Sequence, residues 1–377
     1  MKRIKWNDFP LPLIQVNPPS LSKTNRHLKS VYKSGIFSNS GETQVRVSSQ
    51  LAKHVSKHFS GYLVNNNTMG LTACLLEIDV RNRHVLISNF TFNATLQAVL
   101  LAGGIPVVCD VNPDSLELDL QEVQDLISNE KLDIAAVLPT RIFGYVNDFS
   151  PLIKFCNQHE IPVVIDSAGA FPTTEHTWNF STFSKFEVFS FHATKVFGIG
   201  EGGLIVGLPL DIESVKKRCN FGISFTDGYS FNEGLNAKAD EFTAARASAR
   251  FPEYIDDVKK RCEFVQVYED LVANSKKIKS LPKNSKTVFS YFPIIFEDSS
   301  QLIRFETMAN KYFMTRRYYS PTIKSGYRGT AKIEYASELK ISEAISKRVL
   351  CLPVYVKFQK NVPLKIKEKI KEILEKI

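Results

Sequence analysis

The feature that most limits how this chain can fold is a series of short apolar runs, rich in β-branched residues, between residues 63 and 208. The runs occupy residues 85–87, 106–108, 135–138, 162–165, 188–191 and 204–206. They lack the strict alternation of a strand with one solvated face, and segments of helical period such as 148–159 separate them. Short strands that are apolar on both faces and joined by helices indicate a buried, largely parallel sheet.

The pattern changes after residue 240. Residues 241–274 favour one long helix bent by Pro252, because proline removes a backbone hydrogen bond from a helix interior. The expected later elements are a strand at 288–296, a helix at 301–311 and a Lys-rich amphipathic helix at 363–377. We therefore predict an α/β protein with a large domain at residues 1–245, built on a mostly parallel central sheet, and a smaller C-terminal α+β domain at residues 246–377.

Composition excludes several classes of protein. The 377 residues are 44% hydrophobic and 23% charged, which is typical of a soluble globular chain and not of a disordered tail, a collagen-like repeat or a disulfide mini-protein. The 48 Lys and Arg against 39 Asp and Glu give a net charge of +9, spread along the chain. That balance suits an enzyme that handles a phosphorylated or nucleotide-linked substrate, and we expect no nucleic-acid partner.

The six cysteines predict reduced thiols and a cytoplasmic protein. The nearest two, Cys74 and Cys109, are 35 positions apart, so no CxxC pair exists for zinc or redox chemistry. His54 and His58 have helical spacing but lack the glutamate of HExxH, and we expect no metal site. The N-terminus has no apolar signal region, and no apolar stretch approaches the roughly 18 residues of a membrane span.

Polar residues directly after the apolar runs are the candidate functional residues, because ligands of open α/β sheets bind outside the carboxyl ends of the strands. Asp166 follows one run, and a buried aspartate needs a facing cation or strong donors to ionise. A helix cap is the alternative. Lys195 follows another run in an apolar, glycine-rich setting, where a desolvated lysine can attack carbonyls. A lysine that extends to the surface is the alternative.

The glycines after Lys195 match GxGxxG formally, at Gly198, Gly200 and Gly203. A dinucleotide fingerprint must open a helix, whereas an apolar run, residues 204–206, follows here. We interpret the segment as a tight turn at which backbone approaches something closely. An oxidoreductase is therefore the less favoured alternative.

Two further segments suit an anionic, ring-shaped cofactor. Asn67 and Thr68 precede the helical run 71–78, where phosphate binds at a helix N-terminus, although an ordinary helix cap has the same signature. The segment 90–95 offers an aromatic side chain that can stack on a flat heterocycle, although a core aromatic is the alternative.

Along the chain, the candidate phosphate site, the aromatic segment, Asp166 and Lys195 follow one another in an order that resembles the DegT/DnrJ/EryC1/StrS aminotransferases. These are the sugar-nucleotide branch of fold type I pyridoxal phosphate enzymes. The resemblance runs from about residue 11 to residue 374. It is carried by residues 90–95 (FTFNAT), 102–111 (AGGIPVVCDV), 164–168 (VIDSA), 190–195 (SFHATK), 201–203 (EGG), 234–236 with 240–241 (GLN, DE) and 350–353 (LCLP).

The resemblance implies roles for individual residues. Lys195 would hold pyridoxal 5'-phosphate in imine linkage and later move the proton, and Asp166 would pair with the pyridine nitrogen and make the ring an electron sink. Phe92 would stack on the ring. The phosphate would meet Asn67, Thr68 and Ser190, together with Asn236 of the partner subunit in a homodimer. Residues expected to contact substrate are Arg141, His192, Arg316, Tyr318 and Tyr319.

The reaction implied by the resemblance is amino transfer from L-glutamate to a keto sugar on a nucleoside diphosphate, for an amino sugar of a surface polysaccharide, such as a lipopolysaccharide O-antigen, or glycoconjugate. The His-Ala-Thr-Lys form of the lysine motif is similar to the subgroup that aminates C4 of dTDP-4-keto-6-deoxyglucose. Amination at C3 and a catalytically silent sugar-nucleotide-binding relative are the alternatives, and the nucleotide and the sugar stereochemistry stay open.

Three positions depart from the family pattern. The residue three after the aspartate is usually Gln or His and touches the ring hydroxyl, whereas here it is Gly169. The usual Pro-Val-His-Leu-Tyr-Gly block is PTRIFG at residues 139–144, with Arg141 in place of the His, and the usual Gly-Thr of the phosphate turn is Asn67–Thr68. These changes leave the substrate and the turnover rate open, whereas the prediction of cofactor binding is unaffected.

Overall fold

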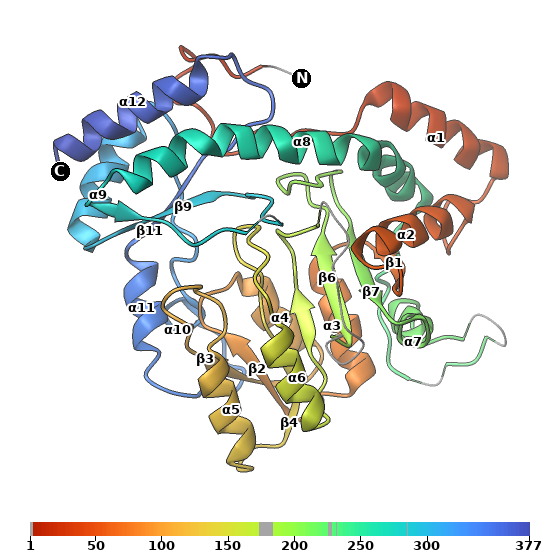
Figure 1. Cartoon of the computed structure of the whole chain (residues 1–377). Helices are drawn as coiled ribbons and strands as arrows, with labels where there is room; N and C mark the ends of the chain where they lie inside the picture. Colours follow the sequence, from red (N-terminus) through yellow and green to blue (C-terminus); the bar gives the residue numbers. More distant parts are fainter. Residues whose placement is uncertain (1–2, 173–183, 225–227, 231, 285) are drawn as a thin grey trace.

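A central sheet with helices on both faces organises the molecule (Figure 1). The computed structural model describes residues 3–172, 184–224, 228–230, 232–284 and 286–377. The strands of the large sheet are β1 (Ser60–Val64), β2 (His84–Ser88), β3 (Ile105–Cys109), β4 (Ile134–Leu138), β5 (Val164–Asp166), β6 (Phe186–Ser190), β7 (Gly203–Gly207) and the short β10 (Glu334–Tyr335). Each of the six apolar runs forms one of these strands, which confirms the α/β prediction.

The strand order places the ends of β4, β5 and β6 next to one another. One part of the sheet has the order β1–β7–β6–β5 and the other has the order β10–β3–β2–β4. The parallel bridges Val137↔Val163 and Thr140↔Asp166 join the two parts at β4 and β5. Strand β7 is antiparallel to β1 and β6, and every other pairing within the sheet is parallel. The predicted mostly parallel sheet is confirmed.

Helices cover both faces of the sheet, which explains why its strands do not alternate. The helices of this region are α3 (Asn67–Ile78), α4 (Asn93–Leu101), α5 (Leu120–Ser128), α6 (Ser150–Gln158) and α7 (Pro209–Cys219). In β2, Val85 and Ile87 pack in the cluster formed with α3, α4 and α7, whereas Leu86 packs in the cluster formed with α5 and α6. Successive residues therefore enter two different cores, and all of them are apolar.

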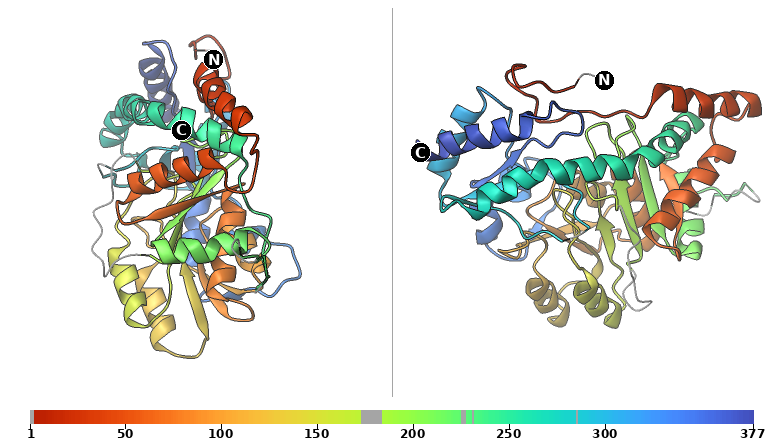
Figure 2. Two further views of the ribbon diagram at one scale, coloured as in Figure 1. Left: turned by 90° about the vertical axis from the view of Figure 1, so that its right-hand side faces the viewer. Right: turned by 45° about the horizontal axis from the view of Figure 1, so that its top comes forward.

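A long helix, α8 (Glu241–Ala273), spans the molecule along one side of the sheet (Figures 1 and 2). Its first half packs with α1 (Leu21–Ser34) and α2 (Glu42–Val55), and its second half packs with the C-terminal helix α12 (Val362–Glu375). Pro252 lies inside α8, as predicted. No helix within the described residues is long and apolar enough to cross a membrane.

A second, smaller sheet has the order β11–β9–β8 and packs against α8, α9 and α12. Its elements are β8 (Ile278–Lys279), β9 (Phe292–Phe296), α9 (Ser299–Ala309) and β11 (Val349–Leu352). The strand predicted at 288–296 begins only at residue 292, because Phe289 has a φ of 49°, outside the extended region. The predicted helices near 301–311 and 363–377 are present as α9 and α12.

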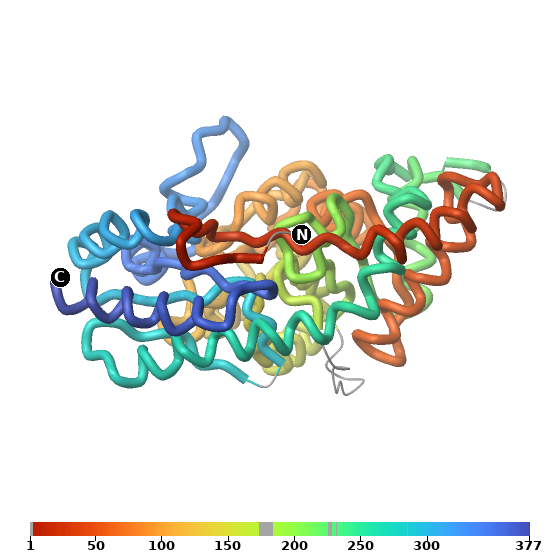
Figure 3. Tube along the Cα trace, turned by 90° about the horizontal axis from the view of Figure 1, so that it is seen from above, coloured from red at the N-terminus to blue at the C-terminus, as the bar shows by residue number. Residues whose placement is uncertain are grey.

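The two parts of the molecule exchange segments at both ends of the chain. Near the N-terminus, Ile4 bridges Phe358 and Leu11 bridges Phe313, so the first residues lie along the C-terminal part (Figure 3). Conversely, β10 adds to the large sheet, and α10 (Ile323–Gly326) and α11 (Lys340–Ser346) pack close to it. The predicted division at residues 245 and 246 lies inside α8, which belongs to both parts.

Candidate active site

A cavity of about 640 Å³ opens at the carboxyl ends of the strands, where an open α/β sheet binds its ligands. Its walls come from the large sheet, from residues 290–291 before β9 and from residues 316–319 before β11. Predicted site residues that line it are Asn67, Thr68, Phe92, Arg141, Asp166, Ser190, His192, Lys195, Arg316, Tyr318 and Tyr319. Eleven of the twelve therefore meet at one cavity, and Asn236 does not.

Asp166, the last residue of β5, is 3% exposed and has donors around its carboxylate. Its Oδ2 accepts a hydrogen bond from Thr95 Oγ1 at 2.8 Å. Its Oδ1 accepts from the backbone N–H of Ala168 at 3.1 Å and from Asn67 Nδ2 at 3.4 Å. Burial raises the pKa of Asp166, while these hydrogen bonds and the charge of Lys195 lower it. A cationic ligand group in the cavity would further favour the carboxylate.

Lys195 lies in the loop of residues 191–202 that connects β6 to β7, here called the lysine turn. The turn is closed by the bridge His192↔Gly200, and Gly200 has a φ of 115°, a conformation that favours glycine. Burial lowers the pKa of Lys195, and the charge of Asp166 opposes that shift. Lys195 therefore has a larger neutral fraction than a lysine in water, which is the state that attacks a carbonyl.

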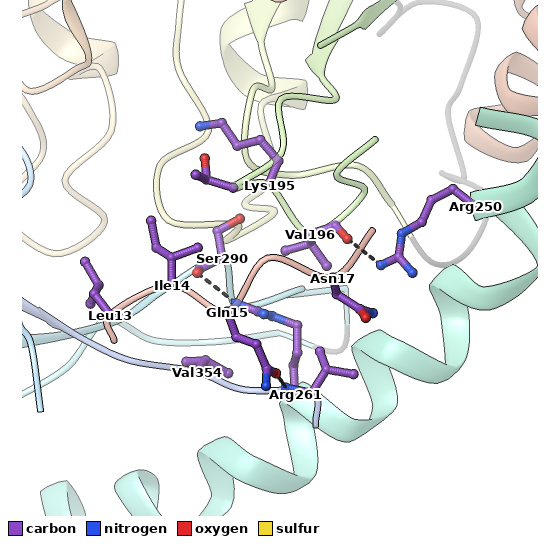
Figure 4. A pocket seen from close by; sticks show the side chains of 12 residues that line it. Leu13, Ile14, Gln15, Asn17, Lys195, Val196, Arg250, Arg261, Ser290 and Val354 are labelled. Carbon is purple, nitrogen blue, oxygen red and sulfur yellow. Dashed lines mark hydrogen bonds between the residues drawn. The ribbon is translucent and has the colours of Figure 1, made fainter. Parts of the chain in front are cut away.

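The lysine turn is held from behind by α8 (Figure 4). Arg250 Nη2 donates to the carbonyl of Val196 at 2.8 Å, and Arg261 Nη2 donates to the carbonyl of Ser290 at 2.8 Å. Between them lies a small space of about 10 Å³, enough for one water molecule. The side chain of Lys195 points away from both arginines. Arg250 thus holds the backbone of the lysine turn and Arg261 holds that of residue 290, while Lys195 lines the large cavity.

The predicted phosphate site lies at the N-terminus of α3. Asn66 caps this helix, and its Oδ1 accepts from the N–H of Met69 at 2.9 Å. The Asn67 side chain points to the sheet, where its Nδ2 donates to the carbonyl of Val188 at 3.1 Å as well as to Asp166. The groups left for an anion are the first backbone amides of α3 and the hydroxyls of Thr68 and Ser190, which both line the cavity.

Gly203 explains how α3 comes so close to the strands. A Cβ atom at this position would lie 2.9 Å from the carbonyl carbon of Asn66 and 3.0 Å from the nitrogen of Asn67. Only glycine leaves room for this approach. Gly203 also begins β7, as expected for a glycine-rich link between two strands and not for a dinucleotide fingerprint.

Phe92 and Asn236 are both exposed, in different settings. Phe92 precedes α4, is 57% exposed and presents its ring at the cavity. Asn236 lies outside the cavity, where its Oδ1 accepts from Lys238 Nζ at 2.7 Å and its carbonyl accepts from Asn65 Nδ2 at 3.2 Å. Asn236 does not line the cavity of its own chain, and its role in the site of a partner subunit stays a prediction.

Arg141 has a different environment from that of a free substrate-binding arginine. It is 3% exposed, its Nε donates to Glu187 Oε1 at 3.2 Å, and its Nη1 donates to the carbonyl of Asn147 at 2.5 Å. The guanidinium also lies 4.6 Å from the ring centre of Phe149. Because its guanidinium forms a buried ion pair with Glu187, we interpret Arg141 as a support of the cavity wall.

The remaining predicted substrate residues come from the lysine turn and the C-terminal part. His192 is half-buried, and its Nδ1 lies 2.8 Å from Thr194 Oγ1. The Arg316 guanidinium lies 4.6 Å from the ring centre of Tyr318, whose hydroxyl is 3.3 Å from that of Tyr291. Tyr319 stacks on Phe143 at 5.8 Å between ring centres. Arg316 lines the cavity, and its contact with substrate stays a prediction.

The sequence did not indicate several residues of the cavity. Thr91, Thr140, Ser290 and Tyr291 line it, and Thr95 contacts Asp166 from behind its wall. Ser290 Oγ donates to the carbonyl of Gly169 at 2.6 Å, and a Cβ at Gly169 would lie 3.2 Å from this hydroxyl. A larger residue at position 169 would therefore require the Ser290 hydroxyl to shift by a few tenths of an ångström.

A model of the DegT/DnrJ/EryC1/StrS aminotransferase family matches residues 20–371. The chain belongs to this family. The dTDP-4-amino-4,6-dideoxy-D-glucose transaminase of Shigella dysenteriae is 27% identical over 373 residues, which cover 97% of this chain and 99% of that protein.

Two solved structures share the fold of this DegT/DnrJ/EryC1/StrS aminotransferase. DesI, in the presence of its TDP-sugar product, has a TM-score of 0.84 at 22% identity, over 98% of this chain and 95% of DesI. NtdA from Bacillus subtilis, with bound cofactor PMP, has a TM-score of 0.79 at 19% identity, over 94% of this chain and 82% of NtdA. The chain is a pyridoxal-phosphate-dependent aminotransferase.

The residues of the cavity fit this cofactor. A buried carboxylate with donors on its protein side, a lysine with a lowered pKa and a helix N-terminus all face one cavity. These groups suit a pyridinium nitrogen, an aldehyde and a phosphate respectively. The cavity volume of about 640 Å³ lies within the range of pockets that bind small-molecule ligands.

Proposed function

We propose that this aminotransferase transfers an amino group from L-glutamate to C4 of dTDP-4-keto-6-deoxyglucose and so makes an amino sugar for a surface polysaccharide, such as a lipopolysaccharide O-antigen, or a glycoconjugate. The observation that carries the proposal is the convergence of Lys195 and Asp166 on a cavity that also contains the Arg316–Tyr318 pair. The Shigella dysenteriae relative, which matches over almost its whole length, is named for a dTDP-linked 4-amino sugar.

Asp166 and Lys195 would perform the chemistry in this proposal. Pyridoxal phosphate, when bound, supplies an electron sink that acidifies the carbon bearing the transferred nitrogen. Asp166 would hold a proton on the ring nitrogen, since its carboxylate is buried and already surrounded by donors on the protein side. Lys195 would move a proton between the two carbons that flank the transferred nitrogen, because burial lowers the pKa of its amine, which makes it a better base than a lysine in water, and it lines the cavity.

Other side chains would bind and orient the ligands. The amides at the start of α3, with Thr68 and Ser190, would hold the cofactor phosphate, and Phe92 would cover one ring face. Arg316 would hold the diphosphate of the sugar nucleotide through bidentate hydrogen bonds. His192, at the cavity edge with Tyr318, would meet the sugar.

We further propose a cytoplasmic homodimer with shared active sites. Asn236 is exposed and lies outside the cavity of its own chain, and its segment precedes α8 on the surface. In a dimer its amide would complete the phosphate site of the partner subunit. A mixture of a Lys195→Ala chain and an Asn236→Ala chain should then regain activity, because one of the two sites in a mixed dimer carries neither change.

The test of the proposed substrate is a screen of keto sugar nucleotides with glutamate as donor and NMR identification of the product. Formation of a 4-amino sugar from the dTDP-linked 4-keto substrate is the expected result. A product aminated at C3 would instead support the alternative position. A preference for a GDP- or UDP-linked substrate would contradict the proposed dTDP linkage. A protein that binds cofactor but transfers no nitrogen to any of these substrates would be a silent sugar-nucleotide-binding relative.

A further inference from the structure

Three buried threonine hydroxyls connect the Asp166 carboxylate to the wall of the large cavity. Thr95 Oγ1 lies 2.8 Å from Asp166 Oδ2. Thr91 Oγ1 then lies 2.9 Å from Thr95 Oγ1 and 3.0 Å from Thr140 Oγ1. The three threonines are 2%, 0% and 5% exposed in chain order. Thr91 and Thr140 line the cavity, whereas Thr95 lies behind its wall.

The backbone fixes this chain of hydroxyls. Thr91 and Thr95 are one helical turn apart at the junction of β2 and α4, where the N–H of Thr95 donates to the carbonyl of Phe92 at 3.1 Å. Thr140 follows β4 and forms a parallel bridge with Asp166. The ends of β2, β4 and β5 therefore bring the three hydroxyls and the Asp166 carboxylate together.

The charge of Asp166 gives the chain a direction. An ionised carboxylate can only accept hydrogen bonds, so Thr95 must donate to it. Each hydroxyl has one proton, so Thr95 then accepts from Thr91, and Thr91 accepts from Thr140. The Thr140 oxygen consequently turns only lone pairs toward the cavity, where it can accept a hydrogen bond from a ligand.

We propose that Thr140, Thr91 and Thr95 form a positioning chain that keeps Asp166 ionised and oriented toward the cofactor ring, and that Thr140 accepts a hydrogen bond from a hydroxyl or N–H group of the substrate. The inference rests on the role proposed above for Asp166. It adds a substrate contact at Thr140 and a reason for the three buried hydroxyls.

The electrostatics of the site agree with this geometry. Burial raises the pKa of Asp166, and the Thr95 hydrogen bond is the largest of the effects that lower it. Loss of Thr91 would free the Thr95 hydroxyl from its partner and weaken its hold on Asp166. A protonated Asp166 would donate to Thr95 and reverse all three hydroxyls, so that Thr140 would become a donor.

The experiment compares Thr95→Val and Thr91→Val with the matched controls Thr95→Ser and Thr91→Ser. Two readouts are independent of turnover: the dissociation constant of pyridoxal phosphate from each protein, and the pH dependence of the bound cofactor's absorbance. Thr95→Val should weaken cofactor binding about tenfold or more, since it removes a hydrogen bond to a charged group. The change in cofactor absorbance at acid pH, where Asp166 becomes protonated, should move to higher pH by about one unit.

Thr91→Val should have the same effects at a smaller size, about two- to tenfold in affinity, because it removes a bond between neutral groups. Both serine variants should stay near the wild type. For the substrate contact, Thr140→Val should raise KM for the sugar nucleotide more than it lowers kcat. Melting temperatures are measured for all variants.

Three outcomes would overturn the inference. In the first outcome, both valine variants have the cofactor affinity and absorbance of the wild type, whereas Asp166→Asn changes both. This would show that the hydroxyls do not affect the cofactor, although Asp166 does. Serine variants as impaired as the valine variants would show that the methyl groups matter and the hydroxyls do not. An Asp166→Asn variant with unchanged cofactor binding and spectrum would remove the role of Asp166, and the inference with it.

Discussion

Replacement of Arg141 by methionine separates a supporting role from a substrate contact. Arg141 and Glu187 are 3% and 0% exposed, and Glu187 Oε2 has no hydrogen-bond partner among the described residues. Arg141→Met leaves Glu187 Oε1 with only the Ser167 hydroxyl as donor. Breaking a buried ion pair in this way costs about 3–5 kcal/mol.

The expected change in melting temperature follows from the chain length. At about 2.1 cal/mol/K for each residue, the 377 residues have an unfolding entropy near 0.8 kcal/mol/K. The melting temperature of Arg141→Met should therefore fall by roughly 4–6 °C. The double variant Arg141→Met, Glu187→Gln should recover most of this loss, because the unpaired charge is gone.

Arg83→Met is the matched control. Arg83 pairs with Asp133, but the two side chains are 41% and 65% exposed, and such pairs contribute about 0–1 kcal/mol. Thermal unfolding and steady-state kinetics are measured on all three proteins. We expect an unchanged KM for the sugar nucleotide in the double variant. A melting temperature near the wild type, combined with a strongly raised KM in both Arg141 variants, would refute the supporting role.

Three further predictions concern other parts of the site and its supports. Asp166→Asn should lower kcat by about a hundredfold or more, since it removes a fixed charge next to the reacting group, and a kcat within a few-fold of the wild type would contradict this. The stability of Glu117→Gln relative to the wild type should rise by about 2.5 kcal/mol from pH 5 to pH 8. Burial raises the pKa of Glu117 from 4.5 to about 7, so the folded wild type binds a proton more tightly than the unfolded chain and loses stability as the pH rises through this window. The same stability difference between Glu117→Gln and the wild type at pH 5 and at pH 8 would argue against this burial. Gly203→Ala should destabilise the protein by about 1–3 kcal/mol in urea unfolding and weaken cofactor binding, because a Cβ would push α3 from the strands, and a neutral effect would contradict the close approach.

The large sheet was predictable from the sequence because burial on both faces has a simple signature. Val85, Leu86 and Ile87 enter two different cores, so the whole run is apolar. The positions of Asp166 and Lys195 at strand ends were predictable for the same reason. The fold places both residues at one cavity, and the family resemblance supplied their roles.

Other parts depend on contacts between segments far apart in the sequence. Nothing near Arg141 indicates that Glu187, 46 positions later, would take its charge. Likewise, Ser290 has no local pattern that places its hydroxyl beside Gly169. The exchange of segments between the two parts of the molecule also leaves no local signal, because β10 is only two residues long.

The most direct test of the account is the position of the covalent bond between the protein and its cofactor. The protein loaded with pyridoxal phosphate is reduced with borohydride, digested and analysed by mass spectrometry, with Lys195→Ala as control. We expect the pyridoxyl group on the peptide that contains Lys195, and no labelled peptide in the control. A label on any other lysine, or a labelled Lys195→Ala protein, would contradict the assignment of this cavity as the active site.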